Sequence, residues 1–430
     1  MTSLKPVVPV ELDTESPAGQ YAAVRKQTED LAAPLTAEDA MVQSCADASP
    51  TKWHLAHTSW FFETFILAPH LHGYRPFDHR FQSLFNSYYN SLGPQPDKAL
   101  RNTFSRPTLD EVIAYRHHVD EHIEDMLGAG DAPDTLVKLV EMGANHEQQH
   151  QELIVTDIKH AFWTNPLRPI YQNSFSTVAG SPSSAIPQRQ HNYDEGMHEI
   201  GADPGKFYFD NEAPRHKTFG AAFRLATRLV TCAEYLSFME DKGYSRPELW
   251  LSDGWKAVQA HGWNAPLYWE KHSDEWWQFT CSGMRKVDQH EPVCHVSFYE
   301  ADAFARWAGA RLPTEFEWEI AASRINPEGN LLEAGRFHPR AAEAQEANQP
   351  AQMFGDVWEW TASAYLPYPG YKPMAGALGE YNGKFMSNQM VLRGGSCITP
   401  QSHIRATYRN FFPPETRWQF SGIRLADDGN

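Results

Sequence analysis

The longest periodic segment of the sequence is TLVKLVEMGANHEQQHQELIVTDIKHAF, Thr135–Phe162. Apolar residues recur in it at the spacing of one helix face, and Pro166 follows closely, so the segment predicts one long amphipathic helix. Three earlier segments carry the same periodicity: 38–49, 52–67 and 108–127. Thr108 is a suitable N-cap for the last of them. Four such helices with short connections predict a four-helix bundle within residues 1–170.

The composition changes on either side of these helices. Residues 73–101 are aromatic and irregular, which favours a long loop, and residues 171–199 are rich in small and polar residues, which favours a linker. From residue 200 to 430 the sequence shows short strand-like runs separated by Gly, Pro and Trp turns. Two modest helices are expected there, near 231–242 and 299–308. This pattern is typical of an α+β domain with much irregular structure.

The composition restricts the class of protein. The 430 residues are 41% hydrophobic and 21% charged, which excludes a disordered chain. The 37 basic and 54 acidic residues give a net charge of −17, so the basic footprint of general nucleic-acid binding is missing. No apolar run approaches the about 20 residues of a membrane helix. We therefore expect small-molecule partners, no nucleic acid and no membrane, while the oligomeric state stays open.

The cysteines and the first residues indicate a compartment. Met1–Gln20 holds no basic segment followed by an apolar run, so we expect no signal peptide. The five cysteines are widely spaced and form no CxxC pair: Cys45, Cys232, Cys281, Cys294 and Cys397. This spacing argues against a disulfide framework or a zinc knuckle and favours the reducing cytoplasm.

The most informative residues are HEQQHQE, His146–Glu152, within the long helix. Two histidines at i and i+4 project from one helix face, so both imidazoles can reach one metal ion, and Gln149 lies on the same side. The pattern is also HExxH, in which Glu147 would be the general base of a zinc protease. The metzincin extension of that motif is absent, since Leu153, Ile154 and Thr156 follow.

A third ligand is available upstream, in WHLAH, Trp53–His57. Either His54 or His57, added to the i, i+4 pair, makes a three-histidine site between facing helices of the bundle. Three neutral imidazoles suit zinc, iron(II), nickel or copper and leave coordination positions open for chemistry. The alternative interpretation is that these are surface histidines on charged helices, because the chain has 20 histidines.

At these residues the sequence resembles a known family. SPTKWHLAHT (Ser49–Thr58) and HEQQHQE resemble the DinB-like metal bundle of the ergothioneine-biosynthesis sulfoxide synthases (EgtB). Four motifs of the second half resemble the formylglycine-generating-enzyme (FGE)-like domain: PVCHVSFYEADA (292–303), RLPTEFEWE (311–319), GDVWEWT (355–361) and LRGGS (392–396). The resemblance covers nearly the whole chain. It implies a DinB-like four-helix bundle followed by a C-type-lectin-type FGE-like domain.

The resemblance also implies an activity. Enzymes of this family use non-haem Fe(II) and O2 to join a cysteine-derived sulfur to C2 of the imidazole of hercynine, which gives a sulfoxide. The iron ligands that carry over are His57, His146 and His150, with His57 preferred to His54 because it holds the Leu-Ala-His position. The donor is cysteine or γ-glutamylcysteine, and the paired tyrosines of NSYYN (86–90) resemble the cysteine-using branch.

Further site residues follow from the resemblance. Tyr89 or its neighbour Tyr88 is expected to be the proton donor, because a phenol with a pKa near 10 is protonated at neutral pH. The amide of Gln149 is expected to bind the substrate imidazole. The residues expected to bind the trimethylammonium group of hercynine are Asn410, Phe411 and Phe412, and those expected to bind the carboxylate of the donor are Lys98 and Arg101.

Several alternatives remain at this stage. A synthase of the same architecture could use a selenium donor and make selenoneine, and other DinB-like bundles are zinc hydrolases or thiol transferases. A lectin-type domain can also be a binding module without catalysis. Formylglycine formation is disfavoured, because that chemistry uses a cysteine pair near the C-terminal motif and 398–410 holds no second cysteine after Cys397. We interpret Cys397 as a small buried apolar residue.

Overall fold

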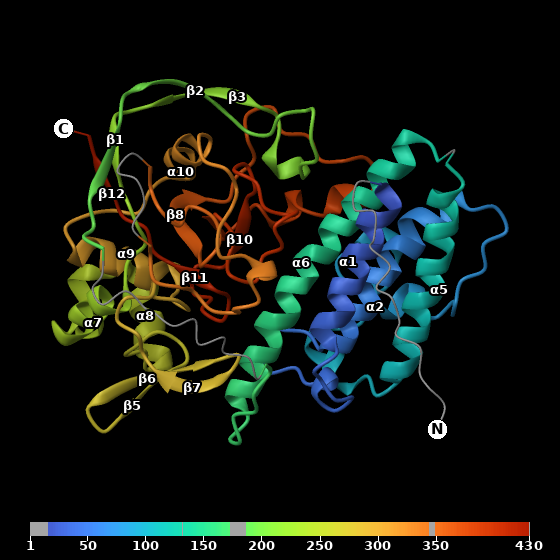
Figure 1. Ribbon diagram of the computed structural model, residues 1–430, viewed down its shortest axis with the longest axis horizontal. Coiled ribbons are helices and arrows are strands. Elements are labelled where there is room, and N and C mark those ends of the chain that lie inside the picture. The colour runs from blue at the N-terminus through green and yellow to red at the C-terminus, as the bar shows by residue number, and fades with distance from the viewer. Residues whose placement is uncertain (1–15, 131, 173–185, 344–348, 430) are drawn as a thin grey trace, which may run out of the picture. The chain divides into compact units, whose positions relative to one another are not determined.

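The computed structural model describes residues 16–130, 132–172, 186–343 and 349–429 (Figure 1). The chain divides into two compact units. The first comprises the described residues up to Val42 together with Ser49–Ser87 and Pro94–Ile154. The second comprises Gln43–Ala48, Tyr88–Gly93 and the described residues from Val155 onward.

The first unit is a helical bundle. Its long helices are α1 (Pro17–Ala32), α2 (Thr51–Phe62), α5 (Leu109–Gly128) and α6 (Asp134–Thr164), of which α6 continues into the second unit. Helix α2 packs against α5, and α1 packs against both. Thr108 caps α5 as predicted, because its hydroxyl accepts from the amide of Glu111 while the Glu111 carboxylate accepts from the amide of Thr108.

The first helix of the bundle differs from the prediction. Segment 38–49 forms only a short 3-10 turn, η1 (Asp39–Met41), and its serines and aspartates favour turns over helix interiors. The missing helix is α1, which begins with Ser16 as N-cap and Pro17 in its first turn. Apolar periodicity does not reveal α1, because its buried face includes Arg25 and Thr28.

Helix α2 is buried along its entire length. It continues through the π-helical turn η2 (Glu63–Leu67) into α3 (Ala68–His70). The predicted loop 73–101 is irregular, with the short helices α4 (Phe81–Leu84) and η3 (Asn90–Leu92) and the start of η4 (Lys98–Thr103). A fully buried helix is stabilised by tertiary packing rather than by an amphipathic stripe.

The second unit contains four small sheets and is of mixed α+β type. The first sheet has the order β1 (Gln190–Tyr193), β4 (Phe223–Ala226), β12 (Ala426–Asp428), and the second β10 (Asn410–Phe412), β9 (Met390–Arg393), β8 (Trp358–Ala364), β11 (Ser421–Gly422). The others are β2 (Gly196–Ile200) with β3 (His216–Gly220), and β5 (Trp269–His272), β6 (Glu275–Thr280), β7 (Gly283–Lys286). The pairings are antiparallel except β8 with β11.

Helices of the second unit lie around these sheets. They are α7 (Cys232–Glu240), α8 (Ser252–His261), α9 (Phe298–Trp307) and α10 (Glu315–Ala322), with the short turns η5 (Asp210–Glu212), η6 (Gly243–Ser245), η7 (Pro247–Leu249), η8 (Leu332–Ala334), η9 (Gly376–Glu380) and η10 (Gly383–Phe385). Helices α7 and α9 confirm the two predicted helices to within two residues at each end. Helices α8 and α10 were not predicted.

The segment predicted as a linker contains structure at its C-terminal side. Strands β1 and β2 lie before residue 200, while residues 173–185 of the predicted linker fall outside the described residues. Both strands are mostly polar and partly exposed, so they carry no apolar alternation from which a strand could be predicted. Residues 190–193 and 196–199 of the predicted linker therefore lie in strands.

The second unit is packed around tryptophans and buried ion pairs. Trp318, Trp358 and Trp360 are fully buried, and the Trp318 indole donates to the Glu359 carboxylate at 2.9 Å. Arg424 pairs with Glu359 at 2.7 Å. All five cysteines are free, and Cys397 is fully buried, as predicted. Among the described helices, none has both the length and the apolar composition that crossing a membrane requires.

Candidate metal centre

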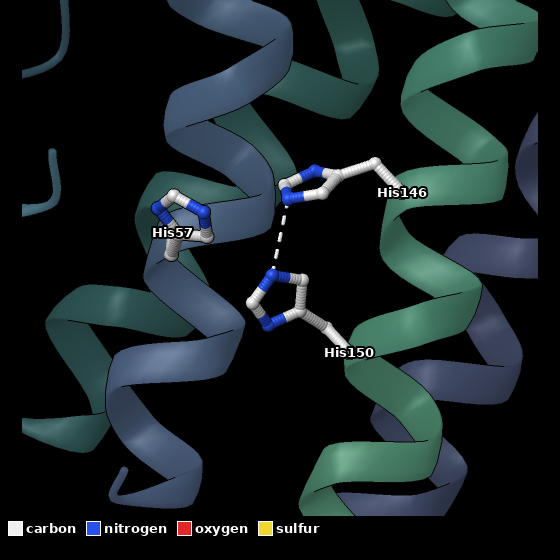
Figure 2. A group of neighbouring side chains, drawn as sticks. All are labelled: His57, His146 and His150. Carbon is white, nitrogen blue, oxygen red and sulfur yellow. Dashed lines mark hydrogen bonds between the residues drawn. The ribbon is translucent and has the colours of Figure 1, made fainter. Parts of the chain in front are cut away.

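Three histidines of the first unit converge in the bundle. His57 comes from α2, and His146 and His150 come from α6 (Figure 2). All three side chains are buried, and one nitrogen from each lies within 4.8 Å of the others. The Nε2 atoms of His146 and His150 are 3.0 Å apart, so both rings turn the same nitrogen toward one point. The i, i+4 spacing and the facing helix therefore produce the three-nitrogen arrangement that the sequence predicts.

The ring of His57 is held in one tautomer. Its Nδ1 lies 2.7 Å from the carbonyl oxygen of Phe85, which can only accept, so Nδ1 carries the proton and donates it. The Nε2 atom then has a lone pair, and among the described residues it is buried without a hydrogen-bond partner. A buried acceptor left unsatisfied is unfavourable unless something binds it. A metal ion at this nitrogen fits that requirement, and the backbone carbonyl behind the ring is a typical outer support of a histidine ligand.

His54 has a different place in the site. Its Nδ1 atom lies 2.8 Å from Nδ1 of His150, on the side of the His150 ring opposite its Nε2. His54 therefore contacts a member of the triad and is not itself one of the three grouped nitrogens. An imidazole in this position orients the His150 ring, in the way that outer partners orient metal-bound histidines.

Burial keeps all three imidazoles neutral. Burial lowers the pKa of His146 to about 3, against a smaller opposing effect of the Glu147 charge. It also holds the pKa values of His57 and His150 well below the usual range, and the neighbouring histidines add to the effect. At neutral pH the triad therefore offers lone pairs rather than protons, which is the state that binds a metal ion.

Aromatic rings and one cation border the triad. The Trp53 ring lies nearly parallel to the His57 ring, with centroids 4.5 Å apart and an interplanar angle of 12°. The Arg101 guanidinium lies 3.4 Å from the centroid of the Trp53 ring, and its Nη atoms donate to hydroxyls of Ser49 and Ser87. The positive charge of Arg101 contributes to the lowered pKa values of His57 and His150, so its field reaches the triad.

Glu147 does not have the environment of a protease general base. Its two carboxylate oxygens accept from Arg25 at 2.7 Å and from Arg116 at 2.9 Å, and all three side chains are buried. Burial alone would raise the pKa of Glu147, but the two guanidinium groups hold it at about 2. A carboxylate that is this acidic and held by two ion pairs is a poor proton acceptor at neutral pH.

The other predicted site residues of the first unit lie on helix α6 and on the short helix η4. Gln149 is half-buried on α6, directly before His150. Lys98 and Arg101 share the short helix η4, but Lys98 is exposed whereas Arg101 is buried. The structure thus brings Arg101, but not the Lys98 side chain, into the buried surroundings of Trp53.

The remaining predicted residues belong to the second unit. Tyr89 is fully buried and its ring lies 4.8 Å from that of the half-buried Tyr88. Tyr88 also meets Phe385 at 5.3 Å, and Phe385 stacks on Phe411 at 6.0 Å. Asn410, Phe411 and Phe412 form strand β10 and are all half-buried. The paired tyrosines and the predicted hercynine-binding strand are therefore joined through one aromatic ring.

Some features of the site had no signal in the sequence. The Phe85 carbonyl is a backbone group, and Arg25 and Arg116 are charged residues on helices that belong to none of the motifs described above. The role of His54 had a signal, since it lies three residues from His57 on the same helix, but spacing alone does not separate a ligand from its support. The packing of α2 against α6 separates the two residues, because it places His57 rather than His54 in the group with His146 and His150.

A helical bundle with a buried histidine triad, joined to a mixed α+β unit, defines a two-domain class of metal-dependent protein. Residues 20–154 match the DinB superfamily, and residues 184–429 match the sulfatase-modifying factor enzyme 1-like domain. The chain is 33% identical over 314 residues to the hercynine oxygenase of Mycolicibacterium smegmatis, which covers 66% of this chain and 70% of that protein. The chain belongs to the hercynine oxygenase family of ergothioneine biosynthesis and is an oxidative enzyme.

Two further relatives agree with this family. The hercynine oxygenase of Mycolicibacterium thermoresistibile is 32% identical over 310 residues, covering 67% of this chain and 68% of that protein. The hercynine oxygenase of Mycobacterium tuberculosis is 37% identical over 240 residues, covering 51% of this chain and 56% of that protein. The family and the two-domain fold that the sequence predicts are thereby confirmed.

Proposed function

We propose that this protein is an Fe(II)- and O2-dependent sulfoxide synthase that acts on hercynine and on cysteine or γ-glutamylcysteine. The thiol, the C2–H of the hercynine imidazole and O2 would give one C–S bond, one sulfoxide oxygen and one water. The reaction removes four electrons from the two substrates, and O2 takes them up. The observation that carries the proposal is the buried triad of neutral imidazoles in a chain of the hercynine oxygenase family; within the part of the chain that the structure describes, Nε2 of His57 has no hydrogen-bond partner.

His57, His146 and His150 would hold the metal ion through one nitrogen each. A bound Fe(II) supplies open coordination positions for the thiolate sulfur and O2, together with one-electron redox chemistry. Because the three ligands are neutral, they leave the positive charge of the ion uncompensated, which favours binding of a thiolate anion. The Phe85 carbonyl and His54 hold two of the three rings in place.

Arg101 would bind the carboxylate of the sulfur donor. Its guanidinium is buried and donates to the hydroxyls of Ser49 and Ser87, so it places a positive charge in the interior of the bundle. Its field already reaches His57 and His150. Lys98, exposed on the same short helix, is the weaker of the two proposed donor-binding cations because a solvated ammonium group contributes little.

The hercynine contacts would come from an amide and from aromatic faces. The amide oxygen of Gln149 can accept from the imidazole N–H and turn C2 toward the sulfur. The trimethylammonium group has no hydrogen-bond donor, so aromatic faces and an amide oxygen suit it. Phe411 offers a preorganised ring, stacked on Tyr365 with centroids 4.0 Å apart, and Asn410 and Phe412 flank it on the same strand.

Tyr89 would supply the proton, with Tyr88 as its neighbour in the loop. Burial raises the pKa of Tyr89 well above its usual range, and the nearby Tyr88 and Tyr381 raise it further. The phenol therefore stays protonated at neutral pH and can donate a hydrogen without first carrying a charge.

The test is an anaerobic assay of the full-length protein reconstituted with Fe(II), hercynine and either thiol. O2 is then admitted, and the products are identified by mass spectrometry. We expect a hercynyl-cysteine sulfoxide that disappears in His57→Ala and His150→Ala, and a shift toward oxidised thiol in Tyr89→Phe. Oxidised thiol alone from the wild-type protein would contradict the proposed acceptor. Activity with zinc and without O2 uptake would contradict the proposed reaction.

A further inference from the structure

A buried Arg–Glu–Arg cluster lies next to the histidine triad and takes no part in the proposed reaction. It consists of Arg25 on α1, Arg116 on α5 and Glu147 on α6. Arg25 Nη1 donates to one oxygen of Glu147 at 2.7 Å, and Arg116 Nη2 donates to the other at 2.9 Å. The side chain of Glu147 is completely buried, as is that of Arg116, while that of Arg25 is 4% exposed.

The same two arginines also bind α2. Arg25 Nη2 donates to the hydroxyl of Ser59 at 2.8 Å. Arg116 Nη1 donates to the hydroxyl of Thr58 at 2.9 Å and to the carbonyl oxygen of Leu55 at 3.1 Å. Each guanidinium therefore connects α6 at the residue after His146 with α2 at residues one or two positions from His57.

These contacts form a brace between the two helices that carry the triad. Apolar side chains on packed helices permit small shifts and rotations, because dispersion contacts have no preferred direction. A guanidinium donates in a fixed planar fork, so two forks that grip both helices fix their separation and register. A metal site needs its ligands held to within about 0.5 Å, which is finer than apolar packing alone specifies.

We propose that Arg25, Arg116 and Glu147 are positioning residues that set the geometry of the metal centre by holding α2 and α6 in register. The inference rests on the proposed function, since it takes the triad to be the metal site. A buried ion cluster adds little stability over apolar residues of the same volume, because desolvation offsets the attraction of the charges. What the cluster adds is a set of directional hydrogen bonds, and these bonds hold residues next to His57 and His146.

The experiment measures metal binding by the full-length protein with Co(II) as the probe, because its ligand-field absorption reports coordination geometry independently of activity. The triple variant Arg25→Met/Glu147→Leu/Arg116→Met removes the three charges of the cluster together. Asp120, which pairs with Arg25 at 2.6 Å, then loses that partner but keeps the hydrogen bond from the Tyr21 hydroxyl and is 16% exposed. We expect the triple variant to keep its circular dichroism and its thermal midpoint. Its Co(II) affinity should fall about 10-fold or more, which is the effect of removing outer support from ligands, and its absorption bands should shift.

A second variant keeps the positive charge at position 116 and removes the planar guanidinium that donates in two directions. In Arg116→Lys one ammonium group replaces a guanidinium that spans Glu147, Thr58 and Leu55, so we expect weaker Co(II) binding and shifted bands in a folded protein. Glu359→Gln is the matched control, because it breaks a buried carboxylate–arginine pair of the second unit. Its absorption bands should equal those of the wild type even if its thermal midpoint falls.

The outcomes separate the two proposals. If either brace variant folds and binds Co(II) with wild-type affinity and wild-type bands, the cluster is packing only and the inference is wrong. If the triple variant does not fold, the Arg116→Lys variant decides. If the wild-type protein itself gives no ligand-field bands, the proposed metal site fails, and the brace inference is overturned with it.

Discussion

Gly143 lies on α6 one turn before His146, and its replacement by alanine tests how closely the two ligand-bearing helices approach. A Cβ atom added at Gly143 would lie 2.4 Å from Cε1 and 2.8 Å from Cζ of Phe62 on α2. Two effects then oppose each other. Alanine is the better helix former by about 1 kcal/mol. The added methyl group enters a space in which carbon atoms prefer separations of about 3.5–4.0 Å.

The packing effect should win, because Phe62 cannot move aside. Its ring is fully buried, meets the Tyr21 ring edge-on at 5.0 Å and lies 5.4 Å from the Arg25 guanidinium. Forcing a methyl group into such a site costs typically about 1–3 kcal/mol. After the gain in helix propensity, Gly143→Ala should lower the free energy of unfolding by up to about 2 kcal/mol. It should also weaken Co(II) binding, since the two helices that carry the triad are forced apart.

The assay is thermal and denaturant unfolding of the full-length protein, following the transition that moves when Co(II) is added. Gly128→Ala is the control, because a Cβ at Gly128, also on a bundle helix, meets nothing within 4 Å. Gly143→Ala/Phe62→Leu should recover part of the loss by making room. If Gly143→Ala stabilises the protein as much as Gly128→Ala does, the two helices are not in the close contact described and the reasoning is refuted.

Three further predictions follow from the site. The metal-free bundle should lose stability as the pH falls from 7.5 to 5.5, because histidines of the unfolded chain, with a pKa near 6.5, bind protons that the buried triad does not. Each such histidine lowers the free energy of unfolding by about 1.4 kcal/mol over this range. Unfolding midpoints of the bundle that do not change with pH would contradict the buried neutral triad. Arg101→Met should raise the KM for the thiol about tenfold and leave that for hercynine unchanged, whereas equal changes in both would show a general effect on the fold. Cys397→Ala should keep the turnover number within about twofold, because its thiol is fully buried and burial raises its pKa; loss of coupling activity would show that the sulfur takes part.

The sequence locates the histidine triad better than it predicts the bundle around it. His146 and His150 are found from i, i+4 spacing alone, because helix geometry determines where those side chains project. The selection of His57 as a ligand rests on the resemblance; in the structure His57 groups with His146 and His150, whereas His54 contacts His150 from the other side of its ring. Spacing could not decide between two histidines on one helix face.

The errors of prediction also have physical causes. Helix α1 was missed because part of its buried face is Arg25, whose charge is balanced by Asp120 and Glu147 far along the chain. Hydrophobic periodicity cannot detect a face whose burial depends on ion pairs that form only in the fold. Strands β1 and β2 were missed for the related reason that their side chains are largely polar and half-exposed.

The Glu147 carboxylate shows why the HExxH pattern does not determine chemistry. The pattern fixes two histidines on one face and turns the intervening glutamate about 100° from the first of them, whatever the fold. In a zinc protease that glutamate meets the substrate water and acts as the base. Here α1 and α5 present Arg25 and Arg116 to the same carboxylate, so it becomes an anion of the bundle interior. The function of the residue is therefore decided by what packs against its face of the helix, and that information lies in two other helices.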